Sequence, residues 1–297
     1  MSDITLLDGG MGQELLRRSG DTPTNLWATR VMIDHPGIVQ GVHGDYFAAG
    51  ATVATTNTYA VHHDRFAGLP QAAQFDAILA QAVGEAQAAR TAHGSGRIAG
   101  SIGPLRASYR PDVHPEFSEA VPLYAEIAHA LAPHVDLILC ETVASLAHAE
   151  AVLTACAPTG LPVWLAVTVC DTDGTTLRSG EPTRAIAEMA SGRATALLAN
   201  CSAPEAMPAA IDALLASGLP VGAYANAFTR ITDDFLKDNS TVAALSARRD
   251  MGPDAYADHA MGWIARGATI VGGCCETGPA HIATLARAIR AAGHTIV

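Results

Sequence analysis

The sequence has little charge, few aromatic residues and no long apolar run. Charged residues make up only 16% of its 297 positions, and no basic run is longer than a pair such as Arg17 and Arg18. Together with a formal net charge of -11, this argues against nucleic-acid binding, which needs a clustered basic face. No stretch offers about 18 uninterrupted apolar residues, so no membrane span is expected.

The start of the chain also lacks the features of an export signal. Residues 1–12 read MSDITLLDGGMG, with neither a basic beginning nor a long apolar segment. This favours a cytoplasmic protein, in which a disulfide framework is not expected. The six cysteines include no CxxC pair, and metal binding or catalysis is the better general explanation for them.

What the chain does contain is an alternation of short apolar runs and Ala/Leu-rich segments. Hydrophobic residues account for 49% of the sequence, which is enough for a large core. Short apolar runs predict eight strands, at 4–8, 52–57, 97–102, 136–142, 163–169, 196–201, 220–226 and 269–275. Helical patterns include 71–90, 116–132, 145–156 and 281–292.

Eight strand-helix units predict an α/β protein with a closed (β/α)8 TIM barrel. An open doubly wound sheet would carry a GxGxxG loop after the first strand, whereas residues 8–12 read DGGMG. We see no linker, so residues 1–297 are expected to form one domain. The weakly patterned segments 103–115 and 228–252 are expected on the C-terminal face, where barrel active sites lie.

Three cysteines occupy the ends of predicted strands. Cys201 ends the sixth strand, and Cys274 and Cys275 end the eighth. Because the C-terminal strand ends of a barrel share one rim, the three thiolates are expected to meet there. Such a ligand set suits Zn2+ and leaves its fourth position open for water or substrate, as in catalytic sites. The competing interpretation is that a cysteine is simply a small buried residue.

The residues after these cysteines are typical of helix starts. Residues 202–205 read SAPE, which resembles a capping box with an early proline, and residues 277–279 read TGP. A helix N-terminus lowers the pKa of a nearby thiol and would favour the thiolate. The remaining cysteines are expected to be buried, at Cys140, Cys156 and Cys170.

Several segments together carry a family resemblance. They read DGGMGQEL, VHGDYFAAGATVATTNTY, AGSIGP, ETVASLAHAEAVL, LLANCSAPEAM and GGCCETGPAHI. From about residue 8 to residue 285 the chain resembles homocysteine S-methyltransferases, including betaine-homocysteine methyltransferase and the homocysteine-binding module of cobalamin-dependent methionine synthase. The combination of NC after the sixth strand with GGCC after the eighth is highly specific.

The resemblance implies a barrel in which Cys201, Cys274 and Cys275 hold zinc and homocysteine supplies the fourth sulfur. A free thiol titrates near about 8.5 and is mostly protonated at neutral pH. Zinc coordination would keep the homocysteine sulfur as a thiolate that attacks a methyl group on a cationic donor.

The resemblance also implies roles for residues around the metal. Asp8 and Gly9 would lie near the amino-acid end of homocysteine, and Glu141 would pair with its ammonium group. Trp27 and Tyr59 would line the methyl-donor side and hold a cation by cation–π contact. Each has an alternative: Asp8 could cap the first helix, Glu141 could cap a helix or form a salt bridge, and both aromatic side chains could be ordinary packing.

Three further positions have two interpretations each. Asn200 and Asn226 end strands and could hydrogen-bond either the substrate or the backbone. Residues 62–64 read HHD, which could indicate a second metal but is better explained as a solvated loop, since no ligand spacing supports chelation.

The expected function is zinc-dependent methyl transfer to homocysteine, giving methionine. S-methylmethionine is the first choice of donor, followed by betaine or another sulfonium. Residues 57–66 (NTYAVHHDRF) and 224–228 (YANAF) depart from relatives that use S-methylmethionine, so the donor and even the acceptor, another thiol or a selenol, stay open.

Two rival functions come from other classes. One is a thiol- or zinc-binding subunit that works with a separate corrinoid or folate protein. The other is a zinc barrel enzyme that polarises a carbonyl or activates water, which would require a histidine or carboxylate base beside the metal. The oligomeric state is also open, a homo-oligomer included.

Overall fold

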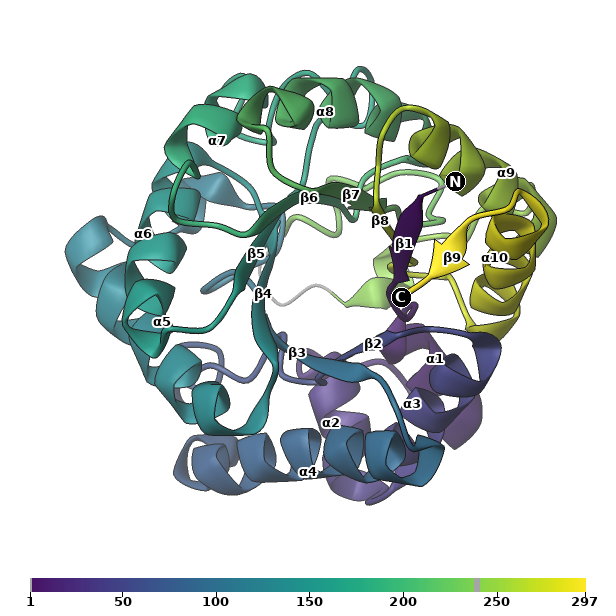
Figure 1. The fold of residues 1–297 in the computed structure, drawn as a ribbon. Helices are drawn as coiled ribbons and strands as arrows, with labels where there is room; N and C mark the ends of the chain where they lie inside the picture. Colours follow the sequence, from purple (N-terminus) through teal and green to yellow (C-terminus); the bar gives the residue numbers. More distant parts are fainter. Residues whose placement is uncertain (1, 238–240) are drawn as a thin grey trace.

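The computed structural model describes residues 2–237 and 241–297. Its parallel strands curl into a barrel, and the helices surround it (Figure 1). The barrel strands are β1 (Asp3–Leu6), β2 (Val53–Thr55), β3 (Arg97–Ile102), β4 (Leu137–Val143), β5 (Val163–Val167), β6 (Ala196–Asn200), β7 (Val221–Tyr224) and β8 (Ile270–Val271). The predicted (β/α)8 architecture is confirmed.

The barrel closes between β1 and β2 through contacts beyond the ends of the regular strands. Leu7 and Val53 form a parallel bridge, and the amide of Thr52 donates to the carbonyl of Leu6 over 2.7 Å. A short extra strand, β9 (Thr295–Ile296), pairs with the start of β1 and brings the two chain ends together (Figure 1). The sequence did not predict β9 because two residues are too few to show a periodicity.

The helices around the barrel follow the strand-helix alternation, with one elaboration between β1 and β2. Three helices lie there, α1 (Met11–Ser19), α2 (Trp27–Asp34) and α3 (Ile38–Ala49). The others are α4 (Phe75–His93), α5 (Phe117–Leu131), α6 (Leu146–Cys156), α7 (Arg184–Met189), α8 (Met207–Leu214), α9 (Pro253–Ala265) and α10 (Pro279–Ala291). The four predicted helices correspond to α4, α5, α6 and α10. Within the described residues, no helix is both long and apolar enough to cross a bilayer.

The barrel interior is filled by side chains. Leu137, Leu139 and Leu198 pack there with Trp164, which is only 7% exposed. Arg97 lies over the Trp164 ring, 5.5 Å from its centre. Because this interior is packed in the manner of other barrels, a ligand site has to be built at a rim.

Some predicted strands end earlier than expected at the rim where the chemistry lies. The strand predicted at 52–57 stops at Thr55, and the one predicted at 269–275 stops at Val271. Beyond Val271 the backbone bonds to neighbouring loops instead: the amide of Gly273 donates to Asp8 and the amide of Cys274 donates to Ala225, over 2.9 and 3.0 Å. The apolar pattern continues past the strand because these loop residues are also covered.

The expected capping box at 202–205 is wrong. The first helical turn after Cys201 is a 3-10 segment, Pro204–Ala206, without a side-chain cap. The Ser202 hydroxyl faces the barrel and hydrogen-bonds Val169, while the Glu205 carboxylate pairs with Arg248 at 2.7 Å. The predicted start of the last helix is confirmed, since α10 begins at Pro279 after the N-cap Gly278.

Candidate active site

Three cysteine sulfurs meet on one rim of the barrel. Cys201 directly follows β6, and Cys274 and Cys275 follow β8 after two glycines. The three sulfur atoms all lie within 4.8 Å of one another. Cys201 and Cys274 are joined as a disulfide, and the sulfur of Cys275 lies 3.8 Å from that of Cys201. Among the residues that the structure describes, this is the one group of three His, Cys, Asp or Glu side chains close enough to share a metal ion.

The spacing of these sulfurs fits a tetrahedral thiolate site. Sulfurs bound to zinc at about 2.3 Å are about 3.8 Å apart along a tetrahedral edge. The sulfurs of Cys201 and Cys275 already have this separation, at 3.8 Å. Reduction of the disulfide would free the sulfurs of both Cys201 and Cys274, which together with Cys275 would give three thiolates. The donor set therefore fits a soft divalent metal ion.

The surroundings of Cys275 oppose a free thiolate. Burial, followed by the nearby Glu276 carboxylate, raises the pKa of the Cys275 thiol to about 12. The lowered thiol pKa that the helix starts predicted is therefore not found at Cys275. A bound cation would supply the compensating charge that the protein itself does not provide there.

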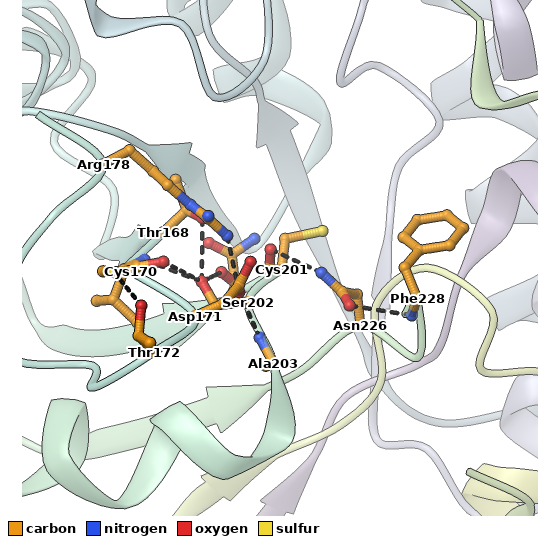
Figure 2. A network of polar contacts seen from close by, with 12 residues as sticks. Thr168, Cys170, Asp171, Thr172, Arg178, Cys201, Ser202, Ala203, Asn226 and Phe228 are labelled. Carbon is orange, nitrogen blue, oxygen red and sulfur yellow. Dashed lines mark hydrogen bonds and ion pairs between the residues drawn. The ribbon is translucent and has the colours of Figure 1, made fainter. Parts of the chain in front are cut away.

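Asn226 ties together the loops that carry the cysteines. Its side-chain amide donates to the carbonyl of Cys201 over 2.9 Å, and its side-chain oxygen accepts from the amide of Phe228 over 3.1 Å (Figure 2). Next to it, the amide of Ala227 donates to the carbonyl of Cys275. Of the two interpretations of Asn226, the structure therefore shows the backbone contact, and this contact positions the cysteine loops.

A cavity of about 440 Å³ opens beside the sulfur cluster. It is walled by the loops after β1, β2, β3, β4 and β7 together with the cysteine loops. Five of the seven predicted site residues besides the cysteines line it: Asp8, Gly9, Trp27, Tyr59 and Glu141. The other two, Asn200 and Asn226, lie outside its lining.

Glu141 at the end of β4 presents a buried carboxylate to the cavity. The hydroxyls of Ser101 and Tyr224 both donate to it, the latter over 3.1 Å. Burial raises the pKa of Glu141, although these two hydrogen bonds oppose the shift. The two alternative roles, helix capping and a salt bridge, do not apply, because Glu141 caps no helix and forms no salt bridge within the described chain.

Asn200 holds the residue that follows Glu141. Its side chain accepts from the amide of Thr142 over 2.9 Å and donates to the Thr142 hydroxyl over 3.0 Å. Thr142 has a φ of 59°, a left-handed backbone conformation that residues other than glycine rarely adopt. Asn200 thus bonds a strained backbone segment rather than the cavity, and through it positions Glu141.

Asp8, in the loop after β1, also lines the cavity and accepts two hydrogen bonds. The amide and the hydroxyl of Thr55 donate to its carboxylate over 2.7 and 2.8 Å. It does not cap the first helix, whose N-cap is Gly10. Burial raises the pKa of Asp8 to about 7, with Glu141 adding to the shift. His43 lies 3.9 Å away but is uncharged at neutral pH, since burial lowers its pKa to about 4.

Gly9 and Gly10 let the loop after β1 approach the cysteine loop. A Cβ on Gly9 would lie 2.5 Å from the carbonyl oxygen of Thr277, and one on Gly10 would lie 2.5 Å from that of Cys274. Both contacts are with backbone, which cannot move aside like a flexible side chain. The sequence signal DGG therefore reflects close packing against the loop that carries Cys274.

We expect Gly10→Ala to destabilise the protein by about 1–3 kcal/mol, as overpacking usually does. The added methyl group would press on Cys274, so metal affinity should fall as well. Thermal unfolding and metal content of the purified variant measure the two effects. Gly44→Ala is the matched control, because a Cβ there meets nothing within 4 Å; equal behaviour of the two variants would contradict the packing argument.

Trp27 and Tyr59 are the aromatic residues that the sequence placed on the donor side. Both line the cavity. Trp27 packs so closely on Gly12 that any Cβ at that position would collide with its indole. The hydroxyl of Tyr59 is within 2.7 Å of the Ser108 hydroxyl, and burial raises the pKa of Tyr59 to about 12. The ring therefore stays neutral at physiological pH.

Sequence reasoning missed Tyr109, which lies in the cavity wall with a φ of 62°. The edge of its ring meets Phe235 with 6.0 Å between ring centres, and the Arg178 guanidinium lies 5.3 Å from its ring centre. Asp171 neutralises Arg178 at 2.8 Å and accepts from the amide of Ala203 (Figure 2). The signal was its position in the segment 103–115, already expected on this face.

Other missed residues line the same cavity. Gln13 does so from α1, and Tyr224 and Phe228 do so from the end of β7 and the loop after it. Gln13 also lowers the pKa of the Cys275 thiol, which partly offsets the effect of burial. Nothing in their local sequence distinguishes them from core residues.

Two expectations about other polar residues need correction. The loop at 62–64 is not simply solvated, because His62 is only 2% exposed and packs edge-on against Tyr124. Burial lowers the pKa of His62 to about 3, so it is neutral. Cys140 and Cys156 are buried as expected, but Cys170 is partly exposed on the rim.

A comparison with known families decides what this site belongs to. The family model described as homocysteine S-methyltransferase matches residues 5–289. The chain belongs to this family. A homocysteine S-methyltransferase of Escherichia coli (strain K12) is 32% identical, over 95% of this chain and 94% of that protein. The Bacillus subtilis (strain 168) homocysteine S-methyltransferase YbgG is 27% identical, over 95% and 93%.

Solved structures of the same family agree in fold. The metallated form of the homocysteine methyltransferase MmuM from Escherichia coli matches with a TM-score of 0.80 and 30% identity, covering 96% of each chain. Its oxidized form matches with a TM-score of 0.78, also at 30% identity, covering 96% of this chain and 95% of that one. This homocysteine S-methyltransferase family member therefore combines the fold of a metallated relative with a cysteine cluster of its own that suits metal binding.

Proposed function

We propose that the protein transfers a methyl group from a small cationic donor to the sulfur of homocysteine, with zinc held by Cys201, Cys274 and Cys275. Methyl transfer to homocysteine follows from family membership. The observation that carries the rest is the position of three sulfurs, within 4.8 Å of one another, at the wall of a cavity of about 440 Å³. Methionine is the product.

Zinc would supply one thing here: it would keep the incoming homocysteine sulfur deprotonated and nucleophilic at neutral pH. The chain's own residues supply orientation. A ligand whose sulfur sits beside Cys201 and Cys275 can place its amino-acid end between the loops after β1 and β4. Asp8 and Glu141 are the two carboxylates that face the cavity there, and both suit its ammonium group.

Glu141 is held in place for a contact with the ammonium group of homocysteine. Ser101 and Tyr224 direct their hydroxyls at its oxygens, and Asn200 fixes the next residue, so the carboxylate is held before the ligand arrives. Pre-organised groups lose less freedom on binding. The shared burial of Asp8 and Glu141 also favours a cationic group between them, since it would relieve the cost of two buried negative charges.

The donor side is largely aromatic. Trp27, Tyr59, Tyr109, Phe228 and Phe235 line the remainder of the cavity. Aromatic faces attract a methylated sulfonium or ammonium group, and apolar walls exclude water from the reacting atoms. We propose S-methylmethionine as the first donor to test, followed by betaine and other sulfonium compounds.

The direct test is a donor panel. Reduced, zinc-loaded protein is given homocysteine with S-methylmethionine, betaine or another sulfonium compound, and methionine is measured. Turnover with one of these donors supports the proposal. If no donor of the panel gives methionine while zinc and homocysteine are still bound, the proposal is overturned. That result would favour a subunit that receives its methyl group from a separate protein.

The activity should depend on the ionisation of Asp8. Its pKa is raised to about 7, so in the free protein its carboxyl gains a proton as the pH falls below that value and loses its attraction for ammonium. We expect kcat/KM for homocysteine to fall below pH 7, approaching about tenfold per pH unit. The profile is measured at saturating donor concentration. Asp8→Asn should be less active at pH 8, and its kcat/KM should no longer fall below pH 7. An unchanged fall of kcat/KM in this variant would contradict the assignment.

A further inference from the structure

We infer that Arg65 binds the carboxylate of the methyl donor, so that the protein selects donors that carry both an onium group and a carboxylate. This rests on the proposed function and extends it to the chemical class of the donor. The main observation is that Arg65 lies in the cavity wall beside Tyr59. Its guanidinium has no carboxylate partner in the described part of the chain.

The position of Arg65 is set by backbone and ring contacts. Its Nε and Nη2 atoms both donate to the carbonyl oxygen of Pro104, over 3.0 and 2.8 Å. Its guanidinium carbon lies over the Tyr59 ring, 5.7 Å from the centre. The side chain is half-buried and lines the cavity. These contacts orient the guanidinium without neutralising its charge.

The neighbouring carboxylate does not provide that neutralisation. The oxygens of Asp64 accept from the backbone amides of Arg65 and Arg106, over 2.9 and 2.5 Å. No ion pair joins Asp64, or any other described acidic residue, to the Arg65 guanidinium. The positive charge is therefore left facing a cavity in a protein whose formal net charge is -11.

The other basic side chains of the cavity wall do have acidic partners. Arg106 pairs with Glu119 at 2.7 Å, Arg110 pairs with Asp112 at 2.8 Å, and Lys237 pairs with Asp234 at 2.6 Å. Arg65 is thus the one basic residue of the wall that lacks an acidic partner among the described residues. This makes it the best candidate to receive an anionic group from a ligand.

The chemistry of Arg65 matches a carboxylate. A guanidinium binds carboxylate oxygens with strong, charge-assisted hydrogen bonds. An onium group held at Trp27 and Tyr59 would place the carboxylate of the same small molecule toward Arg65. A donor without a carboxylate would instead bring a second positive charge close to an unpaired one, and this repulsion adds to the selectivity.

The test uses two matched pairs of donors. S-methylmethionine is compared with its decarboxylated analogue, which keeps the sulfonium and the ammonium, and betaine is compared with choline. For the wild type we expect kcat/KM to favour the carboxylate-bearing member by about ten- to a hundredfold, the usual range for a hydrogen bond to a charged group. Arg65→Gln should lose this preference through a higher donor KM, with the KM for homocysteine unchanged.

Two variants control for structural effects. Arg65→Lys keeps the positive charge but loses the planar guanidinium that can bind a carboxylate in a bidentate manner, and it should retain part of the preference. Arg106→Gln removes a guanidinium that is already paired, and should retain the full preference. Zinc content and thermal unfolding of each variant show whether it folds; should Arg65→Gln fail to fold, the wild-type ratios and Arg65→Lys still decide.

The outcomes separate the two claims. Equal use of both members of a pair by the wild type, or a preference that survives in Arg65→Gln, would overturn the role of Arg65 while leaving methyl transfer to homocysteine intact. Silence of the wild type with all four donors would overturn the proposed donor class, and the role of Arg65 with it.

Discussion

Replacing any one of Cys201, Cys274 and Cys275 by serine should abolish both metal binding and turnover. Each sulfur belongs to a cluster whose members lie within 4.8 Å of one another, so none can be substituted by a neighbour. Loss of a direct ligand should lower metal affinity by more than the about 10- to 100-fold typical of changes to surrounding residues. Metal content of the reduced protein and methionine formation measure the two effects, and each should fall by at least about 100-fold.

The matched control for these variants is Cys170→Ser. Cys170 lies on the same rim, in the loop after β5, but is outside the cluster. Its hydrogen bond to Thr172 can be made by a serine hydroxyl. This variant should keep its metal and its activity. Full activity of a metal-free Cys201→Ser protein would refute the proposed mechanism.

Glu141→Gln should lower kcat/KM for homocysteine by about 10- to 100-fold, mainly through KM. Glutamine keeps the size of the side chain, and its amide oxygen can accept from one of the hydroxyls of Ser101 and Tyr224 while its amide nitrogen donates to the other. It loses the negative charge that we propose to attract the ammonium group of homocysteine. Steady-state kinetics with homocysteine as the varied substrate measure the change, and zinc content should stay at the wild-type level.

Tyr224→Phe separates the charge of Glu141 from its support. It removes one hydroxyl that donates to the carboxylate over 3.1 Å but leaves the charge in place. We expect a smaller effect than for Glu141→Gln, about 2- to 10-fold, since a single neutral donor is lost. A larger effect in Tyr224→Phe would show that geometry at Glu141, rather than its charge, governs homocysteine binding.

Much of the barrel could be predicted because strands and helices leave local patterns. The apolar runs at 97–102 and 163–169 became β3 and β5, and the Ala-rich segment at 145–156 became α6. Errors gathered at the rim, where the run at 269–275 yields only the two-residue β8. Loop residues there are buried by neighbouring loops, so their sequence resembles that of a strand.

The same limit explains the errors in local chemistry. Ser202 and Glu205 have the spacing of a capping box, but Ser202 is drawn to the backbone at Val169 and Glu205 to Arg248, both distant in sequence. His62 looks like a loop residue and is buried by Tyr124. In each case a partner far along the chain outweighs the local pattern.

The sequence was sufficient for the barrel, for the three cysteines at two strand ends and for the family. Strand ends of a closed parallel sheet share one rim, so residues 74 apart, such as Cys201 and Cys275, could be placed together without coordinates. Only the tertiary structure decided which side chains share the cavity, that Asn200 and Asn226 bond the backbone, and that Arg65 has no acidic partner among the described residues. These depend on pairwise distances and burial between loops, which no periodicity in the sequence encodes.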